Sequence, residues 1–259
     1  MIDIKNIENQ LSKTFLNNKP YNHSIIDGFF DYNFAEALAD DFIDYYSDKW
    51  FVYDNPIENK KALNDWNVFP DKTYKALSYL QSNAFVEVLS KVTGVNLYVD
   101  HGLHGGGWHI HANGGNLNPH LDYSIHPKLS LERKLNIIIY LSKELIPELH
   151  GGHLGLWSHD QKNKKPDKLI VEIEPKFNRA VIFDTTQMSW HGMSRKLNTP
   201  LNVYRKSLAI YYLCDPSINA LGNQRALFAA RDNELNDPEI DRIIKMRSSV
   251  LESKKVYRT

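Results

Sequence analysis

The sequence feature that most constrains the fold is a series of short apolar segments separated by turn residues. One of them, residues 134–141 (KLNIIIYL), is too short for a typical buried helix and is rich in β-branched residues, so it predicts a buried strand. About eight such strands are expected between residues 97 and 214. They span residues 97–99, 105–111, 134–141, 151–157, 168–174, 180–184, 189–191 and 204–213. Many short strands at this density indicate a sandwich or barrel, and eight suit a double-sheet jelly roll.

The segments on either side of these strands are predicted to be helical. Apolar residues at helical spacing predict a helix over residues 3–17, and Asn33 with Glu36 has the spacing of a capping box at the start of a second helix. Further helices are expected at residues 71–81, 83–92 and 237–251, and short strands at 23–26 and 50–53. The chain is therefore interpreted as mainly β with flanking helices, in a single domain over residues 1–259. Its parts are a helical support (1–95), a jelly-roll core (97–214) and a C-terminal tail (215–259).

Composition narrows the class of protein. Lysine plus arginine and aspartate plus glutamate both number 31, so the basic surplus that usually accompanies nucleic-acid binding is absent and no nucleic-acid partner is expected. The single cysteine, Cys214, excludes a disulfide framework or a cysteine-ligated metal site within one chain. The sequence begins with no signal peptide, and no apolar stretch approaches the roughly 18 residues of a membrane span. We therefore expect a soluble, cytoplasmic protein with no membrane partner.

His120, Asp122 and His191 are the candidate metal ligands. His120 and Asp122 are two residues apart, so on a strand both side chains leave the same face. His191, arriving from a distant strand, would complete two imidazoles and one carboxylate on one side of a metal, with the remaining positions open. That ligand set is typical of non-haem Fe(II) oxygenases. The spacing alone is a weak signal, and the alternatives are two solvated turn residues and a lone core or surface histidine.

A second group of residues suits the binding of a dicarboxylic acid. Residues 204–212 alternate in character, which places Arg205 and Ser207 on one strand face. A planar guanidinium and a hydroxyl offer bidentate recognition of a carboxylate, although an ordinary surface arginine is the alternative. Tyr140 shares a face with Asn136 and Ile138 and would direct its hydroxyl into the same interior. A buried tyrosine that only bonds to the backbone fits the pattern equally well.

Together these motifs resemble those of the 2-oxoglutarate- and Fe(II)-dependent dioxygenases of the prolyl 4-hydroxylase-like group. The resemblance covers roughly residues 97–214 and rests on five motifs in the family's order. They are residues 105–109, His120-x-Asp122, the strand ending at Tyr140-Leu141, residues 151–157, and His191 followed by Arg205-x-Ser207-Leu208. The resemblance implies a double-stranded β-helix, a jelly-roll variant. It also implies Fe(II) bound by His120, Asp122 and His191, with 2-oxoglutarate held by Arg205 and assisted by Ser207 and Tyr140.

The resemblance also implies a reaction. Such enzymes use O2 to decarboxylate 2-oxoglutarate to succinate while hydroxylating an unactivated C–H bond, and ascorbate keeps the iron of relatives reduced. Some prolyl hydroxylases have lysine at the position of Arg205, so this chain is placed with the arginine-using relatives. A peptidyl proline is the family's default substrate, and a free amino acid, a sugar or a natural-product intermediate is the alternative.

Other readings of the histidines and of the catalytic class are open. His109-x-His111 matches the paired histidines of cupins, but no glutamate follows closely. His150, His153 and His159 cluster near glycines and are expected to be loop groups rather than ligands. A halogenase of the same fold would have a small residue at position 122. A non-catalytic metal-binding module is the alternative from another class, and consumption of 2-oxoglutarate would distinguish it.

A polar segment before the strands is the expected cover of the site. A jelly roll exposes its metal at one open end, and the candidate cover is the polar segment of residues 54–66, which Pro56 interrupts. Within it, residues 54–61 are predicted to form a loop. Such a loop would close over the site and contribute contacts from Asn55, Lys60, Lys61 and Trp66. A solvated connection between helices is the alternative, in which case the tail after Cys214 would be the cover.

Overall fold

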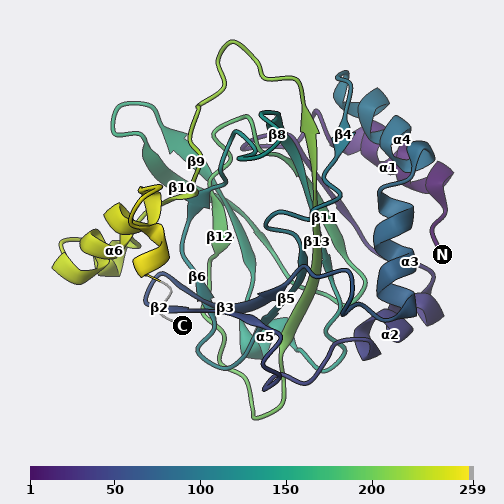
Figure 1. Cartoon of the computed structure of the whole chain (residues 1–259), viewed down its shortest axis with the longest axis horizontal. Coiled ribbons are helices and arrows are strands. Elements are labelled where there is room, and N and C mark those ends of the chain that lie inside the picture. Colours follow the sequence, from purple (N-terminus) through teal and green to yellow (C-terminus); the bar gives the residue numbers. More distant parts are fainter. Residues whose placement is uncertain (257–259) are drawn as a thin grey trace.

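The predicted jelly-roll core is confirmed in the computed structural model, which describes residues 1–256 apart from the side chain of Lys254. Within these residues two antiparallel sheets make up the core, with helices outside them (Figure 1). The larger sheet has nine strands: β1 (His23–Ile26), β11 (Ala180–Asp184), β8 (Glu132–Tyr140), β13 (Arg205–Cys214), β5 (Gly107–His111), β3 (Glu58–Leu63) and β2 (Phe51–Asn55) in spatial order, with β4 (Tyr98–Val99) beside β13 and β6 (Asn116–Leu117) beside β3. The smaller has five: β10 (Lys165–Ile173), β9 (Leu154–Asp160), β12 (His191–Met193), β7 (His120–Leu121) and β14 (Leu227–Phe228).

The apolar run in β8 is explained by burial on both faces. Leu135, Ile137 and Ile139 point away from the smaller sheet and join the core beneath the helices. Tyr140, on the other face, packs against Leu154 of β9 in the smaller sheet. A strand covered on both sides reads as a continuous apolar run rather than an alternating one. β8 is therefore the central partition between two cores.

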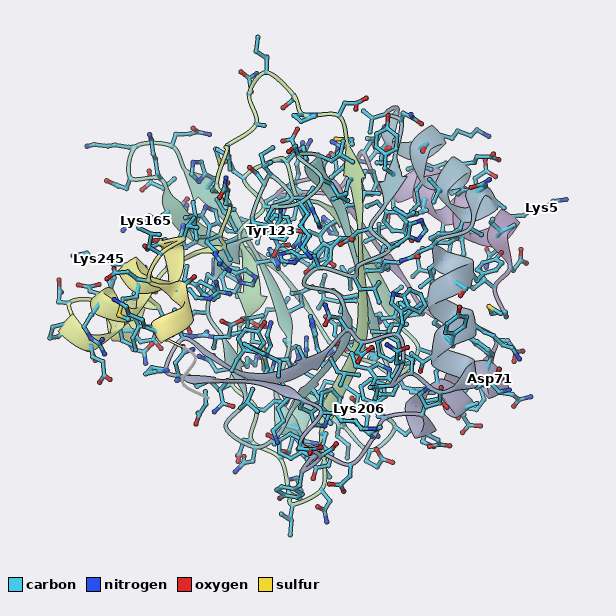
Figure 2. All side chains as sticks on the ribbon, viewed as in Figure 1. Lys5, Asp71, Tyr123, Lys165, Lys206 and Lys245 are labelled. Carbon is cyan, nitrogen blue, oxygen red and sulfur yellow. The ribbon has the colours of Figure 1, made fainter. Side chains whose placement is uncertain are left out.

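The amino-terminal helices cover the outer face of the larger sheet. They are α1 (Ile4–Thr14), α2 (Tyr32–Asp40), α3 (Asp71–Leu80) and α4 (Asn83–Thr93). Figure 2 shows Lys5 and Asp71 on the outside of this layer, whereas Tyr123 lies in the interior of the molecule. The expected capping box at Asn33 is wrong by two residues, because the Asp31 carboxylate accepts the Phe34 N–H and α2 begins at Tyr32.

The prediction of a loop at residues 54–61 is also wrong. These residues form most of a hairpin, in which β2 pairs with β3 and β3 adds to the larger sheet beside β5. The Asn55 side chain closes the turn by accepting the N–H groups of Ile57 and Glu58 at 3.2 and 3.0 Å. β3 is polar because one of its faces lines a polar cavity. In the sequence such a strand cannot be told from a solvated loop, because both are rich in polar residues.

The tail returns to the smaller sheet and completes it. β14 pairs with β7, and α6 (Pro238–Ser248), within the range predicted for a helix, packs Ile240 and Ile243 against Ile57 and Phe228. The short helices α5 (Pro147–His150), Asp232–Glu234 and Ser253–Lys255 complete the fold. The last three residues of the predicted tail lie outside the described residues, and the single-domain division stays a prediction. No helix in the described part of the chain is long and apolar enough to cross a membrane.

Candidate active site

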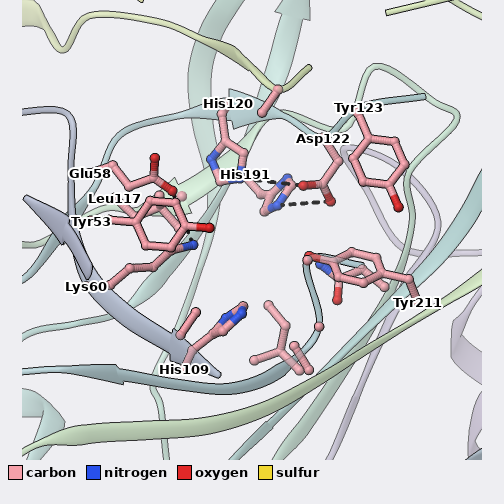
Figure 3. A pocket seen from close by; sticks show the side chains of 18 of the residues that line it. Tyr53, Glu58, Lys60, His109, Leu117, His120, Asp122, Tyr123, His191 and Tyr211 are labelled. Carbon is pink, nitrogen blue, oxygen red and sulfur yellow. Dashed lines mark ion pairs between the residues drawn. The ribbon is translucent and has the colours of Figure 1, made fainter. Parts of the chain in front are cut away.

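The structure brings the three predicted metal ligands together. His120 begins β7 and His191 begins β12, and the two strands pair so that these histidines are direct cross-strand neighbours. Asp122 follows β7 by one residue, and one ligand atom from each of the three residues lies within 4.8 Å of the others. Figure 3 shows them converging on one cavity. The strands approach so closely that a Cβ on Gly192 would lie 2.7 Å from the Asn118 carbonyl oxygen, which explains the glycine after His191.

Hydrogen bonds fix the orientation of both imidazoles. Nδ1 of His120 lies 3.0 Å from the Asn118 carbonyl oxygen, and Nδ1 of His191 lies 2.9 Å from that of Ser189. Because a carbonyl oxygen only accepts, each Nδ1 carries the proton and each Nε2 presents a lone pair. Burial lowers the pKa of both residues, that of His120 to about 3, so both rings are neutral at pH 7.

The lone pairs face a carboxylate, which is the arrangement of a cation site. Nε2 of His120 and Nε2 of His191 lie 3.8 and 3.7 Å from the Asp122 carboxylate oxygens, and Oδ2 of Asp122 is buried with no hydrogen-bond partner in the described structure. Burial opposes ionisation of Asp122, but the neighbouring charges, of which that of Arg133 is the strongest, together outweigh it and lower the pKa to about 2. Three acceptors with no proton between them fit a divalent metal, and two histidines with one carboxylate fit Fe(II).

Arg133 is a site residue that the sequence analysis missed. Its Nη1 lies 3.2 Å from Oδ1 of Asp122, and its guanidinium carbon lies 3.5 Å from the ring centre of Tyr123 and 3.4 Å from that of Tyr211. Nη2 also donates to the His104 carbonyl oxygen at 2.9 Å. The stacked rings and the hydrogen bond fix the guanidinium, and the guanidinium in turn fixes the carboxylate of the proposed ligand.

The residues predicted to bind a dicarboxylate meet on β8 and β13. Ser207 pairs directly with Tyr140, and Nη2 of Arg205 donates to the Tyr140 hydroxyl at 3.3 Å. Arg205 is only 5% exposed, and no carboxylate in the described residues lies within ion-pair distance of it. A buried guanidinium without a counterion is costly, so this position is suited to the carboxylate of a ligand.

Gly152 and His111 complete this end of the cavity. The Gly152 carbonyl oxygen accepts the Arg205 Nε–H at 2.8 Å, and a Cβ on Gly152 would lie 3.0 Å from Cδ of Arg205. Glycine is therefore required where the backbone approaches the arginine. His111 pairs with Arg205 across the sheet, is 2% exposed, and has no hydrogen-bond partner for either ring nitrogen in the described structure. The sequence analysis considered it only as half of a metal-binding pair.

The remaining predicted alternatives are not brought to the metal position. His120, Asp122 and His191 form the one group of three such ligands found among the described residues, so the His109-x-His111 pair makes no separate metal cluster. His150, His153 and His159 do not line the cavity. They are not brought to the metal position, as expected, but only His153 lies in a loop, because His150 ends α5 and His159 lies on β9.

A cavity of about 340 Å³ connects the two ends of the site. Its floor, as we use the term, is the triad with Arg133, Arg205, Ser207 and His111. Its rim is the inner face of the β2–β3 hairpin together with part of the tail. The rim residues are Phe51, Tyr53, Glu58, Lys60, Ala62, Gln224, Arg225, Ala226, Phe228 and Arg247. Figure 3 shows Tyr53, Glu58 and Lys60 on one side of the cavity and Tyr123 and Tyr211 on the other.

Residues 106–213 match the family model described as the 2OG-Fe(II) oxygenase superfamily. This segment contains the triad, Arg205 and Ser207 in a single fold unit. The core of this chain is thus similar to the 2OG-Fe(II) oxygenase superfamily. Fe(II) and 2-oxoglutarate, the cofactors predicted from the sequence, are those typical of this superfamily. A search of curated proteins finds no match.

Solved structures share the fold of this chain at low sequence identity. A prolyl hydroxylase from Trichoplax adhaerens, in complex with a peptide fragment of hypoxia inducible factor, has a TM-score of 0.56 at 15% identity, covering 82% of this chain and 90% of its own. A prolyl 4-hydroxylase from Phytophthora capsici has 0.56 at 18% identity, covering 96% and 77%. SnoN, a non-haem α-ketoglutarate-dependent epimerase from nogalamycin biosynthesis, has 0.54 at 11% identity, covering 86% of each chain.

The tail of the chain supports the strand that carries His120. The Phe228 ring stacks on His120, with centroids 4.9 Å apart and planes 19° apart. Arg231 donates to the side-chain oxygens of Asn118 and Asn116 at 3.0 and 2.6 Å and to the Met193 carbonyl oxygen at 2.6 Å. It therefore ties the residues before β7 to the end of β12. No sequence motif marked this role.

The residues predicted to contribute cover contacts are divided between the cavity and other parts of the molecule. Lys60 lines the cavity as expected. Asn55 forms the hairpin turn, Lys61 donates to the Tyr45 carbonyl oxygen at 2.7 Å, and Trp66 donates to that of His101 at 2.8 Å. One strand face, rather than a mobile loop, therefore supplies the contact.

Proposed function

We propose that this protein is an Fe(II)- and 2-oxoglutarate-dependent dioxygenase that hydroxylates an unactivated C–H bond, in the manner of prolyl hydroxylases. One observation carries the proposal. A single cavity contains a cation site made of three facing acceptors and, separately, a buried guanidinium with no carboxylate partner among the described residues. A bound metal would satisfy the three acceptors, and a bound dicarboxylate would satisfy the guanidinium. His120, Asp122 and His191 would hold the Fe(II).

The floor residues act by orientation and charge. The Asn118 and Ser189 carbonyl oxygens keep the Nε2 lone pairs of the histidines aimed at the metal position. Arg133 keeps Asp122 ionised and in place. When bound, Fe(II) supplies activation of O2, which oxidises 2-oxoglutarate to succinate and CO2 and the substrate C–H to C–OH. Ascorbate as a reductant of the iron stays a prediction.

Arg205 would receive the distal carboxylate of 2-oxoglutarate. The Gly152 carbonyl oxygen takes its Nε–H and the Tyr140 hydroxyl takes an Nη2 hydrogen, so the plane of the guanidinium is fixed before the cosubstrate arrives. Ser207 lines the same end of the cavity and adds a hydroxyl. We add His111 to this group because it lines the cavity and its buried ring nitrogens have no hydrogen-bond partner among the described atoms.

Decarboxylation of 2-oxoglutarate is the test of this function. We expect purified protein with Fe(II), O2 and 2-oxoglutarate to release succinate, and release to rise in the presence of a substrate. The screen would contain proline-containing peptides, free amino acids, sugars and natural-product intermediates. His191→Ala should release none, and His101→Ala, at an exposed histidine outside the cavity, should match the parent. Absence of succinate with every compound, from protein that binds Fe(II), would favour the non-catalytic alternative.

A further inference from the structure

Asn136 is a buried residue of the cavity whose amide oxygen has no hydrogen-bond partner in the described structure. Four residues that line the cavity have such a buried nitrogen or oxygen atom, and they are His111, Asp122, Arg133 and Asn136. Under the proposed function the metal accounts for Asp122 and 2-oxoglutarate for His111, while Arg133 is bonded through its other nitrogens. Asn136 is 2% exposed, and none of these contacts satisfies it. A buried amide group without a hydrogen bond is costly, so Asn136 is suited to contact a bound ligand.

The neighbours of Asn136 place it at the metal end of the cavity. Its cross-strand partners are Phe183 on β11 and Tyr211 on β13, so the three side chains share the face of the larger sheet that points to the smaller one. The Phe183 ring packs on the ring of His191, with centroids 4.6 Å apart. On the other side, the guanidinium carbon of Arg133 lies 3.4 Å from the centre of the Tyr211 ring. Asn136 therefore lies between a side chain that contacts a metal ligand and one that contacts the arginine behind another ligand.

The strand that carries Asn136 leads to the Arg205 end of the cavity. Asn136, Ile138 and Tyr140 share one face of β8, and the Tyr140 hydroxyl accepts a hydrogen bond from Arg205. A ligand held at Arg205 by one carboxylate, extending along β8 toward the triad, passes the apolar Ile138 and reaches Asn136. In the larger sheet β13 and β5 separate β8 from the hairpin of the rim. Asn136 is therefore placed to contact the cosubstrate rather than a substrate that lies under the hairpin.

We propose that Asn136 binds the metal-facing end of 2-oxoglutarate, by donating a hydrogen bond from its amide NH2 group to the carboxylate next to the keto group. The proposal rests on the proposed function and assigns to it a further cosubstrate-binding residue. An amide offers two N–H donors and one acceptor oxygen. Because no described residue bonds to the oxygen and fixes it, the NH2 group can turn toward an anion. Arg205 then holds one end of the diacid and Asn136 the other, so the cavity selects its length as well as its charge.

The experiment titrates the whole protein, loaded with Mn(II), with 2-oxoglutarate and separately with oxalate, by calorimetry. Oxalate carries two adjacent carboxylates that can occupy the metal-facing end, and it has no second end to reach Arg205. Asn136→Leu should weaken the binding of both ligands by about tenfold, the usual effect of losing a hydrogen bond to a charged group. Asn136→Asp keeps the shape of the side chain and should weaken both at least as much, because its carboxylate repels theirs. Arg205→Ala should weaken 2-oxoglutarate binding alone.

Urea unfolding of the metal-free protein separates ligand binding from a structural role. Asn136→Leu should not lower the midpoint of unfolding, because its amide oxygen has no hydrogen bond to lose among the described residues. Asn116→Leu is the matched control. Asn116 is also 2% exposed, but it donates to the Pro56 carbonyl oxygen at 3.0 Å and accepts from Arg231 at 2.6 Å, so its loss should lower the midpoint. A fall in Asn136→Leu as large as that in Asn116→Leu would make Asn136 a structural residue and overturn the proposal.

The titrations can overturn the proposal in two further ways. Oxalate binding that matches the parent in both Asn136 variants would show that the amide does not contact the metal-facing carboxylate. A lower affinity for Mn(II) in Asn136→Leu would show that the residue acts on the metal ligands instead. Failure of the proposed function looks different, because the parent protein would then bind Mn(II) and not 2-oxoglutarate.

Discussion

The floor and the rim of the cavity are held by different kinds of contact. On the floor, main-chain carbonyl oxygens fix the functional groups: Asn118 and Ser189 hold the two imidazoles, and Gly152 holds Arg205. At the rim, side chains hold one another, as Glu58 does with Lys60 and Arg247. A functional group that is hydrogen-bonded to the main chain of paired strands is held in one orientation. A side chain that is held only by another side chain can be substituted without disturbing the main chain. The reaction is thus fixed in the scaffold, and substrate choice lies where substitution is less costly.

The largest effect is expected at the metal ligands. Replacing His191 with alanine should abolish stoichiometric Fe(II) binding and turnover, because the two remaining ligands leave one side of the metal unheld. Circular dichroism should show the fold retained, since the residue lies at the start of a short strand. Metal titration measures the loss, with His101→Ala as the control. Parent-like Fe(II) binding by the variant would remove His191 from the site.

The next effect is expected at Arg205. Loss of one partner of a buried charged pair costs about 2–5 kcal/mol. Arg205→Ala should therefore weaken 2-oxoglutarate binding by about 30-fold or more while leaving metal affinity nearly unchanged. Arg195→Ala is the control, because that arginine is exposed, pairs with Glu172 and lies outside the cavity. Unchanged 2-oxoglutarate binding in Arg205→Ala would place the cosubstrate elsewhere.

A smaller effect is expected where the tail supports the floor. Arg231→Ala removes the hydrogen bonds to Asn118, Asn116 and Met193 without touching a ligand. Loss of groups that orient metal ligands lowers metal affinity by about tenfold or more. Competition with a metal-binding dye would measure it, against Arg242→Ala on the exposed face of α6. Equal affinities would show that the floor is independent of the tail.

The smallest effect is a pH dependence that distinguishes floor from rim. Burial, and then the neighbouring Arg205, lower the pKa of His111, so the unfolded chain binds a proton that the folded one does not. The resulting stability is present above about pH 6.5 and is lost as the pH falls below it, by up to about 1.4 kcal/mol per pH unit. Urea unfolding of metal-free protein should show a shallower decline for His111→Gln. Lys60→Gln removes no imidazole, so its decline should stay close to that of the parent protein.

The floor could be predicted from the sequence because its residues lie on regular strands. Two-residue spacing placed Arg205 and Ser207 on one face, and the structure places both at the cavity. Arg133 was not predicted as a site residue, for a physical reason. On a regular strand Arg133 would point the same way as Leu135, two residues later, which faces the helices. A bulge between the Tyr212–Leu135 and Leu213–Arg133 pairs turns Arg133 toward the cavity instead. A bulge leaves no mark in the alternation of the sequence.

The rim could not be predicted for two different reasons. The hairpin is polar on its inner face, so the residues that line the cavity looked like a solvated loop. The tail reaches the cavity only through tertiary contacts, with Phe228 on His120 and Arg247 on Glu58. Neither contact leaves a local pattern. Element positions were predicted well in the helices and the central strands, where apolar periodicity reports burial directly.

The pairing of β14 with β7 has a consequence for the order in which the protein is made. No floor residue lies beyond Ser207 in the sequence. The strand that flanks His120, β14 (Leu227–Phe228), comes later in the chain. During synthesis the ligands therefore emerge before the segment that stacks on them. A nascent or prematurely ended chain has an open sheet edge beside its metal ligand. We therefore expect a chain that ends before Leu227 to hold His120 less firmly than the complete chain does.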